Sequence, residues 1–107
     1  MSEDTITEAR ELPIACSLPD REQADRMGEI HTGISAGIQQ RVELADGYEF
    51  RFLGDDEWLE KLAQFVRFER ECCRFLTFEI TSDPDKGPIR LRLRGPAGAK
   101  DFIRTML

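Results

Sequence analysis

Hydrophobic residues recur every three or four positions in three stretches of the chain, a spacing that predicts amphipathic helices. The first stretch covers residues 19–39 and the second covers residues 56–73. The third follows Gly95-Pro96 and continues to the C-terminal end. The apolar positions of these predicted helices are, in chain order, Met27, Ile30, Ile34 and Ile38; Trp58, Leu62, Phe65 and Val66; and Ala99, Phe102, Ile103 and Met106.

Elsewhere hydrophobic and polar residues alternate, which is typical of strands with one buried face. Strands are predicted over residues 12–18, 41–53, 76–81 and 89–94, and the hairpin signal Asp46-Gly47 divides the second of these. The predicted order is β-α-β-β-α-β-β-α. This order indicates an α+β fold, in which helices cover one face of an antiparallel sheet. A ferredoxin-like core is the leading architecture.

The 107 residues fit one domain, predicted over residues 12–107 after a mobile acidic tail at residues 1–11. No apolar run approaches the roughly 20 residues that a membrane span requires, so no membrane association is expected. The acidic N-terminal residues lack the pattern of a secretory signal peptide. We therefore expect a cytoplasmic protein, in which all three cysteines are thiols at rest.

The most informative cluster lies at the end of the second predicted helix, where Cys72 and Cys73 follow Glu69. At 100° per residue, Glu69 falls in the middle of the apolar face and neighbours both thiols. Cys16 approaches the cluster if its strand lies beneath this helix. Three thiolates and a carboxylate would suit zinc or a softer metal or metalloid, such as mercury, cadmium, copper(I) or trivalent arsenic. These four residues are the predicted metal ligands.

Two other interpretations of the cluster remain open. Cysteine packs as a small hydrophobic residue, so the thiols need have no chemical role. A thiol-dependent enzyme is the other, but the C-terminal end of a helix disfavours the thiolate that a nucleophile needs. Metal binding suffers less from this position, because a bound metal removes the thiol proton. We assign no catalytic residue, and His31 is expected to be a packing or surface residue.

A second candidate surface is the polar face of the predicted sheet, which carries Arg90, Arg92 and Arg94. This face suggests a non-catalytic interaction or dimerisation module. Cross-strand pairing with acidic residues is the simpler interpretation, and Glu79 should stand near Arg90 or Arg92. The net charge of −6 argues against nucleic acid as a partner. A homodimer and a bound metal ion are the partners that remain open.

The cysteine cluster resembles a group of small uncharacterised bacterial proteins. The shared pattern is Glu69-x-x-Cys72-Cys73-x-Phe75-Leu76-x-Phe78, followed by an alternating strand and a last helix. The earlier Ala15-Cys16-Ser17-Leu18 resembles the usual opening of that group, whereas Arg74 stands where the group usually has proline. The group is loosely associated with heavy-metal resistance genes. The resemblance therefore implies metal binding through the cysteines and Glu69.

Overall fold

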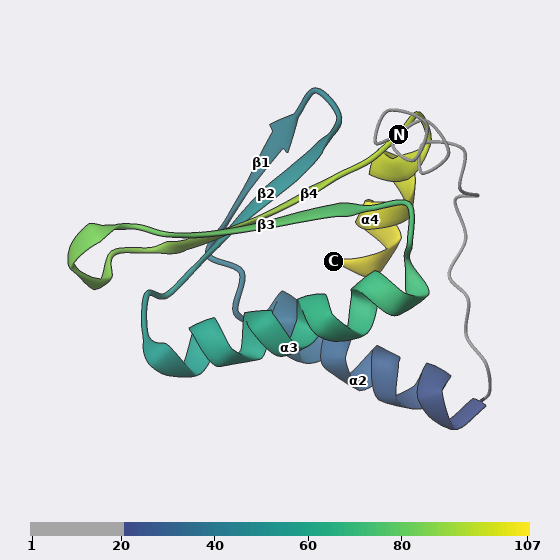
Figure 1. Ribbon diagram of the computed structural model, residues 1–107, viewed down its shortest axis with the longest axis horizontal. Coiled ribbons are helices and arrows are strands. Elements are labelled where there is room, and N and C mark those ends of the chain that lie inside the picture. Colours follow the sequence, from purple (N-terminus) through teal and green to yellow (C-terminus); the bar gives the residue numbers. More distant parts are fainter. Residues whose placement is uncertain (1–20) are drawn as a thin grey trace, which may run out of the picture.

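The computed structural model describes residues 21–107, with side chains from Asp25 onward. Its elements, in chain order, are α2 (Arg21–Ala36), β1 (Gln40–Leu44), β2 (Gly47–Phe52), α3 (Asp56–Cys72), β3 (Thr77–Ser82), the short 3-10 helix η1 (Pro84–Lys86), β4 (Ile89–Arg94) and α4 (Ala99–Met106) (Figure 1). The α+β class is confirmed. The tail predicted over residues 1–11 and the strand predicted over residues 12–18 lie outside the described residues.

The four described strands form one sheet in the order β1-β2-β4-β3, and every neighbouring pair is antiparallel. The predicted hairpin at Asp46-Gly47 is confirmed, because Gly47 opens β2 opposite Leu44. Only glycine fits there: a Cβ on Gly47 would lie 1.8 Å from the carbonyl oxygen of Leu93. β4 lies between β2 and β3, and the ferredoxin-like core stays a prediction.

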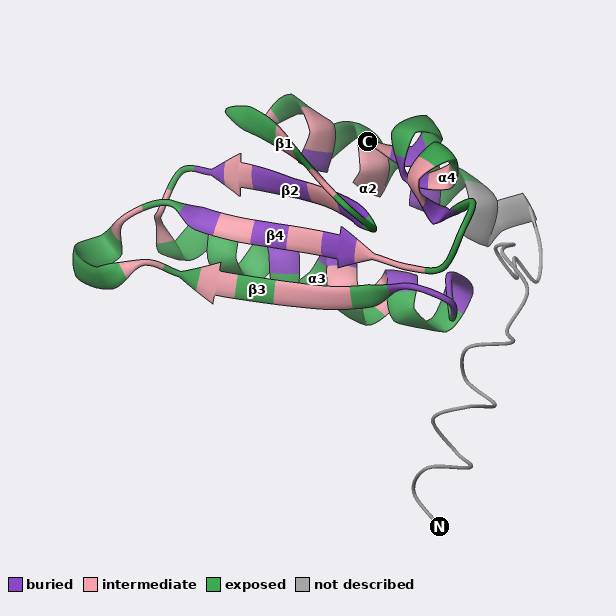
Figure 2. Ribbon diagram, turned by 90° about the horizontal axis from the view of Figure 1, so that it is seen from above, coloured by how far each residue is buried: buried purple, intermediate pink, exposed green. Residues whose placement is uncertain are grey.

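The described helices lie on one face of the sheet (Figure 1). α3 packs on β3 and β4, α4 packs on β2 and β4, and α2 packs on α3. Along β4 the side chains alternate between buried and half-buried, because Ile89, Leu91 and Leu93 point into the core beneath the helices. Figure 2 views the sheet from the face that does not carry the helices. No described helix crosses in front of the strands in this view, so we call this the open face of the sheet.

The position of α2 against α3 depends on a close approach between Gly37 and Trp58. A Cβ on Gly37 would lie 2.1 Å from the indole ring, so only glycine permits this contact. α2 ends at Ala36, whereas the hydrophobic spacing predicted a helix to residue 39. The last apolar residue of that pattern, Ile38, lies in the connection to β1 and still packs against the core.

Both ends of α3 agree closely with the predicted range of 56–73. The side chain of Asp55 caps the first turn by accepting a hydrogen bond of 2.8 Å from the backbone N–H of Trp58. The helix ends at Cys72, and Cys73 is the C-terminal cap, with φ −111° and ψ 75°. Leaving the helical conformation at Cys73 redirects its side chain relative to the preceding turn.

None of the helices within residues 21–107 is long and apolar enough to cross a bilayer.

Candidate thiol and carboxylate site

Glu69 lies in the core, on the face of α3 that carries Leu62 and Phe65. These residues lie seven and four positions before it, so all three occupy the same side of the helix. The side chain of Glu69 is 0 % exposed. The predicted burial of this carboxylate is therefore confirmed, and it requires partners because an isolated buried charge is strongly unfavourable.

Each oxygen of the Glu69 carboxylate has its own partner. Cys73 donates a hydrogen bond from Sγ to Oε1 over 3.3 Å. His31 forms a hydrogen bond between its Nε2 and Oε2. The three side chains make a row from thiol to carboxylate to imidazole, which we call the Glu69 cluster. It joins a helix end to a second helix, because His31 comes from α2 and the other two from α3 and its cap.

His31 belongs to this site, although the sequence indicated only a packing or surface residue. Its side chain is 21 % exposed, so the expectation of partial burial was right. Its ring packs edge-on against Phe65, with centroids 6.0 Å apart. A sequence signal existed: His31 is four residues after Met27 and three before Ile34, which are both buried. That spacing puts the imidazole on the face of α2 that packs against the core.

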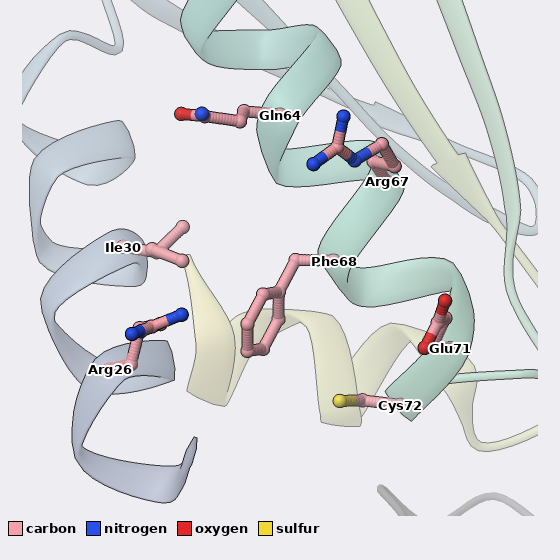
Figure 3. Close-up of a pocket in the computed structure, with 7 residues that line it drawn as sticks. All are labelled: Arg26, Ile30, Gln64, Arg67, Phe68, Glu71 and Cys72. Atoms are coloured by element: carbon pink, nitrogen blue, oxygen red, sulfur yellow. The ribbon is translucent and has the colours of Figure 1, made fainter. Parts of the chain in front are cut away.

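The two adjacent cysteines are both buried but have different surroundings. The thiol of Cys73 is directed to Glu69, and its backbone N–H donates to the carbonyl oxygen of Glu69 over 2.6 Å. Cys72 instead lines a cavity between α2 and α3, and its sulfur points toward the α2 side (Figure 3). The cap conformation at Cys73 accounts for part of this divergence.

Of the four predicted metal ligands, Glu69 and Cys73 are in direct contact, and Cys72 borders the cavity between α2 and α3. Cys16 lies outside the described residues. Among the described side chains, from Asp25 to Leu107, no three of His, Cys, Asp or Glu are grouped so that they could hold a metal ion. The described donors are therefore a thiol and a carboxylate in contact, with an imidazole on the second carboxylate oxygen.

The Glu69 cluster places a hydrogen-bond acceptor and an imidazole next to a thiol. A carboxylate oxygen accepts a hydrogen bond from a thiol, and an imidazole has two ring nitrogens that can each carry a proton. Cys73 follows the last residue of α3, where the helix dipole disfavours a negative charge. A thiolate at this position needs a cation, and a bound metal ion would supply one.

A second buried carboxylate, that of Glu49, lies on the open face of the sheet. Its partners are arginine side chains, which carry a fixed positive charge. Arg92 donates to its Oε1 and Arg51 donates to its Oε2, each over 2.7 Å. Burial opposes ionisation of this carboxyl group, but the hydrogen bonds from Arg92 and Arg51 outweigh that effect and hold the pKa of Glu49 below its ordinary value. We call these three residues the Glu49 cluster.

The other arginines of this face also have acidic neighbours. Arg94 contacts Asp46 over 2.8 Å and Glu79 over 3.5 Å, and Arg90 contacts Asp83 over 2.8 Å. Glu79 stands opposite Arg92 in the register and its carboxylate lies 3.8 Å from that guanidinium, so the predicted cross-strand neighbour is confirmed.

Comparison of the chain with family models, curated proteins and solved structures found no match.

Proposed function

We propose that this protein binds a thiophilic metal ion or metalloid through Cys73 and Glu69, with Cys16 and Cys72 as further ligands. The ions that suit this set are zinc, mercury, cadmium, copper(I) and trivalent arsenic. The supporting observation is the contact of 3.3 Å between the Cys73 thiol and the Glu69 carboxylate in the core. The proposed setting is the cytoplasm, where thiols stay reduced.

The Glu69 cluster supports this function because thiol ligands must lose a proton when they bind a metal. Oε1 of Glu69 is within hydrogen-bond distance of the Cys73 thiol and can accept its proton. His31, on the other carboxylate oxygen, stabilises the carboxylate or passes the proton onward. Carboxylates that bind metals in proteins are commonly hydrogen-bonded by a side chain that does not itself touch the metal, and His31 has this position on Glu69.

The other functions have less support. For an enzyme, the helix C-terminal position of Cys73 disfavours a reactive thiolate in the absence of a metal. For a partner-binding or dimerisation module on the sheet face, a partner would have to compete with Glu49, Glu79, Asp46 and Asp83 for the arginines. A partner-binding or dimerisation module would also leave the contact between Cys73 and Glu69 unexplained.

Metal competition with single cysteine variants tests the proposal. Zinc, mercury(II) and arsenite are each offered to the reduced full chain against a competing chelator or thiol. We expect the wild type to bind at least one of them, and Cys73→Ser to weaken that binding about a hundredfold, since a direct ligand is lost. Cys72→Ser, which changes the adjacent buried thiol, is the matched variant and should have the smaller effect.

Two outcomes would contradict the proposal. One is a wild-type chain that competes for none of the three ions. The other is a Cys73→Ser variant that is folded by circular dichroism and competes as well as the wild type. Cys16→Ser tests the third thiol in the same assay. A loss of metal affinity as large as that of Cys73→Ser would support a site in which Cys16 and Cys73 are both ligands.

A further inference from the structure

The two edge strands of the described sheet, β1 and β3, carry different residues on the side that faces the helices. The outer edge of such a strand presents backbone N–H and C=O groups that can pair with a further strand. On β1 the helix side carries Arg41 and Glu43, which stand opposite Phe50 and Tyr48 in the register and are both exposed. Charged side chains at inward positions commonly protect an edge strand from pairing. The β1 edge is therefore protected.

The β3 edge has hydrophobic residues in the corresponding positions. Phe78 and Ile80 pair with Leu93 and Leu91 of β4, which are buried beneath the helices, so they lie on the helix side as well. Phe78 is half-buried, and Ile80 is 36 % exposed. β3 pairs with β4 in one continuous register from Thr77 to Ser82, without a bulge that would bend its edge away. The β3 edge is thus regular and apolar on its helix side.

The one charged residue of β3, Glu79, does not protect this edge. Its carboxylate lies 3.8 Å from the guanidinium of Arg92 and 3.5 Å from that of Arg94. Both arginines belong to β4, so the charge of Glu79 is compensated over the open face of the sheet. Little net charge is left on β3 to repel another strand.

Exposed hydrophobic surface continues from β3 onto α3. Figure 2 shows α3 behind β4 and β3, and α2 on the β1 side of the molecule. Gln64 and Phe68 border the cavity between α3 and α2, and at 100° per residue Leu59 and Val66 project from the opposite flank of α3. That flank lies along the β3 edge, and Leu59 is 39 % exposed. Leu59 and Ile80 therefore border the same edge of the molecule.

We propose that β3 pairs with β3 of a second copy of this chain, in antiparallel orientation about a two-fold axis. The same surface of both copies then forms the contact, so it must be complementary to itself. In the register centred on Ile80, the facing pairs are Ile80 with the partner's Ile80, Glu79 with the partner's Thr81, and Phe78 with the partner's Ser82. No like charges meet in this register, whereas a register centred on Glu79 would oppose two carboxylates.

A second copy covers this edge better than a single strand from another protein. The two-fold axis brings the Leu59 and Val66 flank of α3 toward its counterpart beneath the paired strands. A lone strand would cover Phe78 and Ile80 and leave the flank of α3 in water. The proposal does not depend on metal binding, because β3 holds none of the proposed ligands. It also leaves the arginines of the open face uncovered.

Sedimentation equilibrium of the full chain measures this association, with a reductant and a chelator present to remove disulfide and metal links. We expect a dimer whose fraction rises with concentration. Ile80→Lys opposes two ammonium groups on the axis, so it should weaken dimerisation about tenfold or more. Leu53→Lys is the matched control, because it adds the same charge at a leucine that is 53 % exposed and lies outside β3. It should change the dimer affinity less than about threefold.

Amide hydrogen exchange of the wild type locates the interface without any variant. The β3 amides that point away from β4 should exchange more slowly as the dimer fraction rises with concentration. The outer amides of β1 should show no such change, because that edge stays unpaired. Circular dichroism of Ile80→Lys verifies that the variant is folded.

Four results would overturn the proposal. One is a wild-type chain that stays monomeric at about 1 mM, where even weak association is detectable. Another is an equal effect of the two lysine variants on the dimer. A third is protection of the outer β3 amides that does not depend on concentration, since a segment of the same chain, such as residues 12–18, would then cover this edge. The fourth is concentration-dependent protection at β1 instead of β3. None of these results bears on metal binding by Cys73.

Discussion

Glu49 and Glu69 are the two buried charged residues in the described part of the chain: Glu49 is on the open face of the sheet, and Glu69 is on α3, which packs on the other face. Glu49 stands on the open face between Arg51 and Arg92. Glu69 lies on α3, where its carboxylate stands between Cys73 and His31. Both carboxylates have a partner on each oxygen. They differ in the chemistry of these partners.

The partners of Glu49 carry fixed charges, because an arginine side chain does not lose its proton in proteins. The Glu49 cluster therefore holds an ion pair that ties β2 to β4 as long as Glu49 is ionised. The partners of Glu69 are a thiol and an imidazole, neither of which carries a fixed charge. One buried carboxylate thus has partners with fixed positive charges, and the other has partners without a fixed charge. Burial alone does not distinguish them.

The largest expected difference in stability is between Glu49→Leu and Glu69→Leu. Glu49→Leu leaves two guanidinium groups without their shared carboxylate, and we expect a loss of about 2–3 kcal/mol in the free energy of unfolding. Glu69→Leu leaves only a thiol and a partly exposed imidazole, so the loss should be below about 1 kcal/mol. Urea unfolding of both variants at neutral pH measures the difference. Equal losses would remove the distinction between the two clusters.

Gly37→Ala tests how the Glu69 cluster is assembled, because this cluster depends on the packing of α2 against α3. The added Cβ would lie 2.1 Å from the ring of Trp58. We expect a loss of about 2 kcal/mol from overpacking. The chain has one tryptophan, so its fluorescence reports the disturbance directly. Gly33→Ala is the control, since a Cβ at Gly33 meets no described atom within 4 Å.

His31→Phe should separate the hydrogen bond to Glu69 from the packing against Phe65. Phenylalanine can keep the aromatic contact but has no nitrogen for Oε2. We expect metal affinity to fall about tenfold while the fold is retained, because His31 supports the carboxylate rather than being required as a ligand. The competition assay measures this change. Thr32→Ala, an exposed position on the same helix, should leave affinity unchanged, and an unchanged affinity in His31→Phe would argue against a role for the imidazole.

The smallest expected effect concerns the pH dependence that Glu49 gives to stability. The pKa of Glu49 is lowered from its ordinary value of 4.5 in the folded protein. Its ionised form therefore stabilises the fold above pH 4.5, and this contribution is lost as the pH falls through the lower, folded value. Relative to Glu49→Gln, the wild type should be more stable by about 1 kcal/mol at neutral pH. Urea unfolding should show this advantage shrinking in acid. An advantage that is unchanged at low pH would contradict it.

The sequence predicted much of the fold because alternation and helical spacing report burial on single elements. The strands of the two hairpins, the range of α3 and the burial of Glu69 follow from those patterns. The sequence also predicted that Glu79 and Arg92 are neighbours, because a hairpin fixes which residues of its two strands face each other. These features depend on residues that are close in the sequence or joined by a short turn.

Other features depend on how separate elements pack. His31 lies 38 positions before Glu69, and its spacing with Met27 and Ile34 gives its face but not its partner. Glu49 follows the polar alternation of its strand, so its burial beneath two long arginine side chains was not expected. The different surroundings of Cys72 and Cys73 come partly from the cap conformation at Cys73, which the helical spacing does not describe.

The central claim is that Glu69 serves metal binding and Glu49 serves stability, and Glu69→Gln compared with Glu49→Gln tests it most directly. Both variants are measured for affinity to the ion that the wild type binds most tightly and for unfolding in urea. We expect Glu69→Gln to weaken binding by about tenfold to a hundredfold with little change in stability. Glu49→Gln should keep the affinity and lose about 1 kcal/mol of stability. Full retention of affinity in Glu69→Gln, or an equal loss of affinity in Glu49→Gln, would contradict the claim.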